Sequence, residues 1–218
     1  MTTYPGSPRL LKGAIVGFDV ANPVASVIVF QYNPNTLTRT IKAKTAEGES
    51  AARSETLRLT GPPSEDIRME IEIDATDQLE SGEDVTTTFG IHPQLAALEM
   101  LLYPKTLDVI LNSVLAATGT LEILPKDAPA TLLVWGPKRV VPIRLSEFTI
   151  TEDAHDPGLN PIRAKVDLNV HILNYQDFNL TDPGFHLFLA HQTLKEAMAT
   201  VGSAGSIANV LGGNVPIL

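Results

Sequence analysis

The residues that could carry out chemistry are few and far apart in this chain of 218 residues. His186 and His191 are five positions apart, a spacing that does not stack two side chains on one helix face as i and i+4 would. The H-E-x-x-H pattern of zinc proteases is therefore absent. The sequence has five histidines and no G-x-S-x-G pattern, so a serine nucleophile has no recognisable setting. We expect His186 and His191 to lie on the surface of a helix, and we expect no catalytic histidine and no zinc site.

Paired carboxylates do not indicate a metal site either. Glu83 and Asp84 belong to an acidic stretch that lacks the D-x-[DN]-x-[DN]-G order of a calcium loop. Asp153 and Asp156 lie in DAHDPGLNP, where aspartate followed by Pro-Gly favours a turn between two long strands. Glycine-rich phosphate-binding patterns are missing as well. The sequence thus predicts no catalytic, cofactor-binding or metal-binding residues, and we expect a protein that is not an enzyme.

Composition argues against several further classes. The chain contains no cysteine, which excludes disulfides, thiolate metal sites and a cysteine nucleophile. Its formal net charge is -9, and threonines dilute the nearest basic cluster, Arg39, Lys42 and Lys44, so we expect no nucleic-acid partner. No run reaches the roughly 18 apolar residues of a membrane span, and the N-terminus does not resemble a Sec signal. We expect neither a membrane span nor Sec-type export.

Strict alternation of apolar and polar residues predicts that most of the chain is β-structure. Apolar residues alternate with charged ones over 67–74 and with polar or charged ones over 163–172, as in strands with one buried and one polar face. In 140–151 the apolar phase changes after Leu145, and a bulge near Ser146 would restore one face. The almost continuously apolar run 24–32 predicts a strand buried on both faces or lying at a subunit interface. Further strands are expected around 11–19, 36–45, 55–60 and 131–135.

Helical signals are fewer. We expect a helix over 92–103, with Pro93 in its first turn, and a second over 183–199. The segments 46–54 and 77–90 look like flexible loops, and the glycine-containing tail after 199 looks like a mobile end or a docking arm. The expected organisation is a β domain over 1–180 with an inserted helix near 92–104, followed by a C-terminal helix and arm over 181–218.

The stretch FQYNPN, 30–35, is the most distinctive local signal. Asn33 can hydrogen-bond its own turn backbone, and Pro34 fixes φ for the next corner position. The residues before this turn are apolar, and those after it alternate between threonines and cations. We interpret the stretch as the corner of a hairpin with no reacting group, and we place the single tryptophan, Trp135, in the core or at an interface.

Three segments in a fixed order, KGAIVGF (12–18), FQYNPNTLTRTI (30–41) and WGPKRVVPIRLSEFTITEDAHDPGLNPIRAKVDLNVHI (135–172), resemble the tube-like baseplate proteins of contractile injection systems. That family has an F-x-Y-N-P stretch, a late Trp-Gly strand and a D-x-x-G-x-P-x-R-A corner between two long strands. The positions that match these motifs in order are Phe30, Tyr32, Asn33, Pro34, Trp135, Gly136, Asp156, Gly158, Pro161, Arg163 and Ala164. The C-terminal LysM module of many relatives has no counterpart in this sequence.

The resemblance implies a β-barrel or sandwich of the phage tail-tube type with one or two helices. It also implies a hexameric ring at the tube–baseplate junction, without a catalytic site or cofactor. The partners it implies are further copies of the chain, the inner tube protein, the spike or hub protein and other baseplate components. Assembly would then take place in the bacterial cytoplasm, before the particle acts. The alternatives are a principal inner-tube or tube-capping protein and, from another class, a β-sandwich module that binds carbohydrate or peptide.

Overall fold

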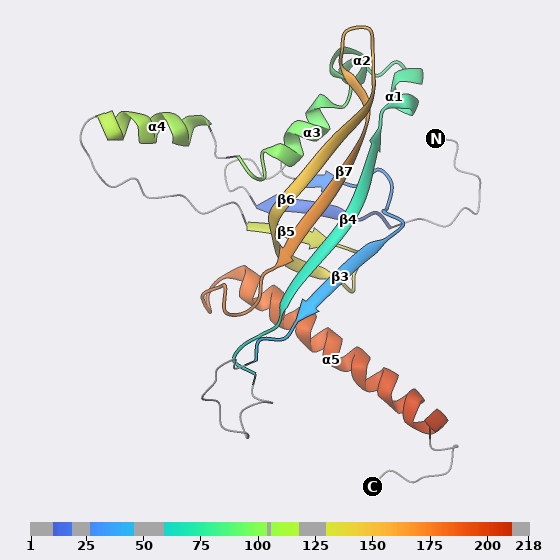
Figure 1. Ribbon diagram of the computed structural model, residues 1–218, viewed down its shortest axis with the longest axis vertical. Coiled ribbons are helices and arrows are strands. Elements are labelled where there is room, and N and C mark those ends of the chain that lie inside the picture. Colours follow the sequence, from blue (N-terminus) through green and yellow to red (C-terminus); the bar gives the residue numbers. More distant parts are fainter. Residues whose placement is uncertain (1–10, 19–26, 46–58, 104–105, 118–129, 211–218) are drawn as a thin grey trace.

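The computed structural model describes residues 11–18, 27–45, 59–103, 106–117 and 130–210 (Figure 1). Within them, a sheet of seven antiparallel strands has the order β2-β1-β5-β6-β7-β4-β3. The prediction of a mainly β protein with a few helices is thereby confirmed. The strands are β1 (Ala14–Phe18), β2 (Val27–Val29), β3 (Leu37–Lys42), β4 (Ser64–Asp74), β5 (Ala130–Val134), β6 (Val140–His155) and β7 (Pro161–Ile172).

β6 is the strand that joins the two halves of the sheet. Its first residues, 140–143, pair with β5, and the rest of the strand, from Ile143 onward, pairs with β7. The register shifts between Leu145 and Glu147, so the bulge that the sequence predicted near Ser146 is confirmed. Because of this bulge, Leu145 is buried while Phe148 and Ile150 still pack against the same core.

The core lies on one face of the curled sheet. β4 and β7 contribute the alternating apolar residues that the sequence pattern indicated, including Ile67, Val166 and Leu168. The helix α3 (His92–Glu99) adds Leu95 and Leu98 to the same cluster. Burial of these side chains supplies the main driving force for folding, and the opposite face of β4 and β7 stays polar.

The helices depart most from expectation. The segment 77–90, predicted as a flexible loop, contains α1 (Thr76–Glu80) and α2 (Asp84–Phe89). The helix expected over 92–103 ends at Glu99, and α4 (Thr106–Ala117) was not predicted. α5 (Pro183–Val210) continues through most of the predicted glycine-containing arm. The predicted loop 46–54 lies outside the described residues, and the proposed domain division stays a prediction.

The apolar run 24–32 is not a strand buried on both faces. Its described part, β2, is a three-residue edge strand in which Val27 and Val29 are 48% and 56% exposed. The reason is position: β2 pairs only with β1, so its other edge and one of its faces lie open. The alternative, that this run lies at a subunit interface, stays a prediction.

Candidate functional site

The segment 30–36 is a crossover and not the corner of a hairpin. It joins β2 to β3, which are the two opposite edges of the sheet and pair with different strands. Asn33 does not bond its own turn. Its side-chain oxygen accepts the Gly13 N–H at 2.8 Å, and its amide nitrogen donates to the Leu11 carbonyl at 2.8 Å. Asn33 thus holds the chain before β1 against the crossover. Tyr32 is exposed, and Pro34 is half-buried.

Phe30 anchors the crossover to the core. Its ring is 2% exposed and packs against half-buried Trp135, with ring centroids 6.4 Å apart. Both rings lie over the backbone of Gly13, where an added Cβ would approach Phe30 and Trp135 within 2.8 and 2.9 Å. The Trp-Gly pair ends β5, and Gly136 adopts φ +70° in the turn to β6. Trp135 therefore has a packing role, in line with the prediction of a core or interface position.

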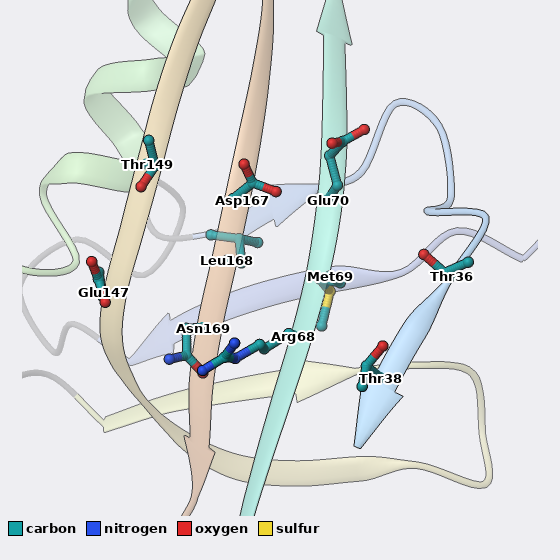
Figure 2. Close-up of a pocket in the computed structure, with 10 residues that line it drawn as sticks. All are labelled: Thr36, Thr38, Arg68, Met69, Glu70, Glu147, Thr149, Asp167, Leu168 and Asn169. Atoms are coloured by element: carbon teal, nitrogen blue, oxygen red, sulfur yellow. The ribbon is translucent and has the colours of Figure 1, made fainter. Parts of the chain in front are cut away.

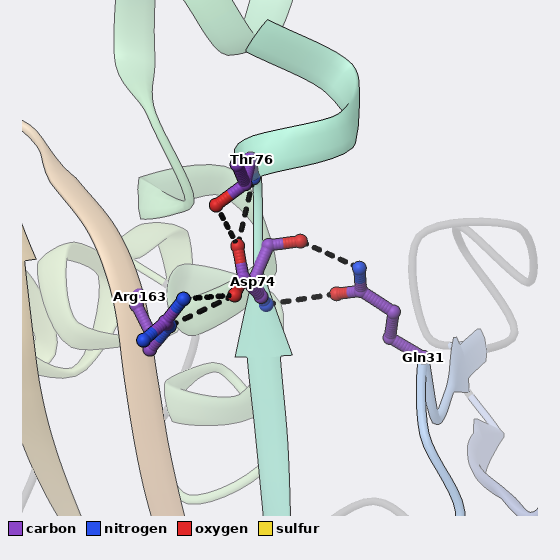
Figure 3. Close-up of polar contacts among 4 residues, drawn as sticks. All are labelled: Gln31, Asp74, Thr76 and Arg163. Atoms are coloured by element: carbon purple, nitrogen blue, oxygen red, sulfur yellow. Dashed lines mark hydrogen bonds and ion pairs between the residues drawn. The ribbon is translucent and has the colours of Figure 1, made fainter. Parts of the chain in front are cut away.

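Asp74, at the end of β4, connects four separate parts of the chain (Figure 3). The Gln31 side chain binds the Asp74 backbone as a neighbouring strand would, donating to its carbonyl at 2.5 Å and accepting its N–H at 2.9 Å. The Asp74 carboxylate accepts the Thr76 N–H and hydroxyl at the start of α1, and two hydrogen bonds from Arg163 at 2.7 and 2.8 Å. This contact gives Arg163 of the family motif a structural role.

Hydrogen bonding sets the protonation state of Asp74. Burial alone would raise the pKa of this carboxyl group, but the hydrogen bonds from Thr76 and Arg163 outweigh it and lower the pKa below its usual value. The same carboxylate holds the pKa of Arg163 above its ordinary value. Asp74 therefore stays ionised, and its charge holds α1 and β7 together.

The β6–β7 corner is closed by Asp156. Its carboxylate accepts both the backbone N–H and the side-chain amide of Asn160 at 2.8 Å, which lowers its pKa. The residue with positive φ is Leu159, at +64°, and not Gly158 as a Pro-Gly turn would suggest. Pro161 is buried and its carbonyl accepts the Ile91 N–H at 2.9 Å, while Ala164 is fully buried between β4 and β6.

The polar face of the sheet carries a shallow depression of about 500 Å³ (Figure 2). Glu70 of β4 and Asp167 of β7 face each other across the ladder, and Glu147 lies on β6 nearby. Arg68 is the one cation among the residues that line the depression. Like charges directly opposite each other are destabilising in a sheet. The Glu70–Asp167 pair therefore contributes no stability to an isolated chain.

A charged cluster fixes α5 to the sheet, and the sequence analysis missed it. Glu65 is 7% exposed, and one of its oxygens accepts hydrogen bonds from Arg39 of β3 at 2.6 and 2.7 Å. Its other oxygen binds the Lys195 ammonium group of α5 at 3.1 Å. Burial alone would raise the pKa of Glu65, but the two cations lower it. The sequence did carry one sign that Glu65 is buried, because Glu65 occupies the same alternating positions as the buried residues Ile67 and Met69.

The five histidines lie on four different elements, α3, β6, β7 and α5. His171 lies on the polar face of β7 and bonds Asp66 at 2.8 Å, and His186 is exposed on α5. His191 is 8% exposed and is not the surface residue that its sequence context suggested. Within the described ranges, no three His, Asp or Glu side chains could hold a metal ion together, and no helix could cross a membrane.

α4 is the least supported element in the described part of the chain. It is held away from the sheet (Figure 1) and has no extensive packing against another described element. Five apolar side chains of this helix are about half exposed, namely Val109, Ile110, Leu111, Val114 and Leu115. Twelve-residue helices are marginal in water without tertiary packing. The exposed apolar surface of α4 therefore requires a covering surface.

Comparisons with known proteins add little. No protein-family model matches the chain, and no curated protein matches it. Two similar solved chains belong to gene transfer agent particles, one in the tail of an empty particle with C6 symmetry and one in the virion of a native particle. Each is 10% identical and matches 73% of this chain and 90% of its own length, with TM-scores of 0.31 and 0.30. Similarity this low carries no argument about function, which has to rest on the chain's own residues.

Proposed function

We propose that this chain is a structural subunit of a contractile injection system. Six copies would form a ring at the tube–baseplate junction, between the spike or hub protein and the inner tube protein. The observation that carries this proposal is α4, an apolar helix whose exposed side chains the described parts of the chain leave uncovered. Covering each of these side chains would contribute roughly 1 kcal/mol, so association with a neighbour is strongly favoured.

The open edges of the sheet support assembly into a ring. β2 and β3 end the sheet on its two sides, and exposed strand edges readily pair with another chain. Two different edges brought together by rotation form a heterologous contact, and such contacts form a ring when the rotation closes. Val27 and Val29 would then be covered by the neighbouring copy.

The polar sheet face supports an inner wall lined by β-structure. Glu70 and Asp167 oppose each other without a described partner for either carboxylate, which is tolerable where the face borders water. A ring whose lumen is lined by this face would leave these carboxylates hydrated. The order of the motifs in the sequence connects such a ring to the tube-like baseplate family.

Native mass spectrometry and negative-stain microscopy of the full chain test the proposal. The chain would be measured alone and after mixing with the inner tube and spike proteins of the same particle. The expected product is a hexamer of the 23.4 kDa chain, about 140 kDa, visible as six-fold rings. A chain that stays monomeric under all these conditions would refute the proposal. Rings that grow into long tubes without the spike protein would instead identify the principal inner-tube protein.

A further inference from the structure

The foot of α5 carries more positive than negative charge. Four basic side chains are within electrostatic range of one buried carboxylate, Glu65, and we call them the basic foot: Arg39 of β3, Arg139 of the β5–β6 turn, and His191 and Lys195 of α5. Glu65 already binds two of these side chains, Arg39 and Lys195. With His191 neutral, three cations face one anion.

Two members of the basic foot have no partner among the described residues. Arg139 is half-buried, and its guanidinium makes neither a hydrogen bond nor an ion pair with any described side chain. His191 is 8% exposed, and its Nδ1 has no hydrogen-bond partner within the described ranges. Buried polar groups are nearly always paired in native proteins, so the unpaired Nδ1 of His191 points to a partner that the described residues do not supply. The guanidinium of half-buried Arg139 is also free, among these residues, to bind a ligand.

Electrostatics indicate that this ligand is an anion. Burial lowers the pKa of Arg139, and repulsion from Arg39 lowers it further. Burial and the charge of Lys195 likewise lower the pKa of His191. A lowered pKa of a basic side chain means that its positively charged form is disfavoured at this position in the basic foot. A carboxylate placed beside Arg139 would remove the repulsion and supply the missing acceptor.

The opposite end of the same chain offers carboxylates. Residues 75–103 contain no Lys or Arg, and α1, α2 and the turn between them expose four acids: Asp77, Glu80, Glu83 and Asp84. We call this group the acidic end. Figure 1 shows α1 and α2 at one end of the sheet and α5 at the other. The two charged surfaces therefore cannot meet within one molecule.

We propose that the basic foot receives the acidic end of a second copy, in a head-to-tail contact between chains. The proposal rests on the proposed function, because both require copies to associate, and it adds the surfaces and the polarity of one contact. Complementary charge of this kind fixes the register of an interface and speeds association. A head-to-tail contact is heterologous, so it can repeat from copy to copy.

A charge-swap experiment on the full chain tests this contact. The substitution Arg139→Glu reverses the charge at one position of the basic foot. The double substitution Asp77→Lys with Glu80→Lys reverses the charge at two positions of the acidic end. Association would be measured by sedimentation velocity at two salt concentrations. We expect each variant alone to associate about tenfold more weakly, and a mixture of the two variants to recover most of the loss. Higher salt should weaken the wild-type contact.

Matched controls separate this contact from general charge effects. Lys138→Glu makes the same charge change at the exposed neighbour of Arg139, and Glu147→Lys with Asp167→Lys matches the acidic double variant. Both should associate as the wild type does. Should Arg139→Glu fail to fold, Arg139→Ala tests the same position. Association that is insensitive to the swaps overturns the head-to-tail contact and leaves the proposed function standing, whereas a wild-type chain that never associates overturns both.

Discussion

The two ends of the sheet differ in how their charges are matched. Near α1, the Asp74 carboxylate is met by Arg163 and Thr76, and the Asp156 carboxylate by Asn160. Near α5, Glu65 is the one carboxylate in a cluster of basic side chains, and Arg139 stays unpaired among the described residues. Matched charges hold local structure in a fixed geometry. Both ends therefore contain charges that hold the fold, namely Asp74 and Asp156 at the first end and Glu65 at the second. Charges without a described partner are the ones left for association, and in our proposal each end contributes one such surface.

The largest effect is expected at the matched end, from Gly90→Ala. Gly90 has φ +59° and ψ -134°, a conformation that essentially only glycine adopts, and an added Cβ would overlap the Pro161 carbonyl. We expect a loss of about 4 kcal/mol in the free energy of unfolding, measured by urea denaturation. Gly82→Ala is the control, because φ is +68° there but no atom lies within 4 Å of the added Cβ. It should cost about 1 kcal/mol. Equal losses of unfolding free energy in the two variants would show that the close approach of Gly90 to Pro161 does not matter for stability.

The next effect is expected at the foot, from Glu65→Gln. Removing the carboxylate leaves Arg39 and Lys195 facing each other without an anion in a half-buried site. We expect a loss of about 3 kcal/mol and faster proteolysis of α5, read by mass spectrometry of the fragments. Glu70→Gln, on the exposed polar face, removes a like-charge contact, so it should not lower the free energy of unfolding and should leave proteolysis of α5 unchanged. Proteolysis of α5 at the wild-type rate would show that the cluster does not fix this helix.

A smaller effect tests whether the Asn33 side chain holds the crossover in place. Asn33→Ala removes the hydrogen bonds to Gly13 and Leu11, and we expect a loss of about 1 kcal/mol by urea denaturation. Asn35→Ala, two positions along the same exposed segment, has no described side-chain partner to lose and should be neutral. Similar values for the two variants would mean that Asn33 contributes no more than an ordinary turn residue.

The smallest effect is a change in pH dependence. The folded pKa values of Asp74 and Glu65 are lowered, so their stabilisation is complete above their unfolded values, near 3.8 and 4.5, and is lost as the pH falls through the folded values. Urea midpoints measured from pH 7 to pH 3 should therefore fall less steeply for Asp74→Asn than for the wild type. Parallel curves would contradict the contribution assigned to Asp74.

The regular strands could be predicted because their pattern is local. Burial of one face imposed strict alternation on β4 and β7, and the phase change after Leu145 located the bulge in β6. The short helices α1 and α2 gave no periodic signal, since Thr86 is the only residue of the two that is buried. α4 was missed although its sequence carries a helical signal, because Ile110, Leu111, Val114 and Leu115 recur at the spacing of one helix face.

The contacts of the crossover and the foot could not be predicted because they are long-range. Asn33 bonds atoms 20 and 22 positions away, so the sequence showed only an Asn-Pro turn. Glu65 and Lys195 are 130 positions apart, and no local sequence pattern predicts their contact. Exposed edges, an apolar helix and unpaired cations are properties of the folded surface. They become visible only once the strand order is known.

Hydrogen exchange in the free chain and in the assembled particle tests the central claim most directly. The claim is that the surfaces left unmatched in one chain, α4 and the foot of α5, are covered by neighbours in the assembly. It predicts that amides of α4 and α5 exchange at least about tenfold more slowly in the particle, while those of β4 and β7 around Asp74 change little. Equal exchange of α4 in both states would contradict the account.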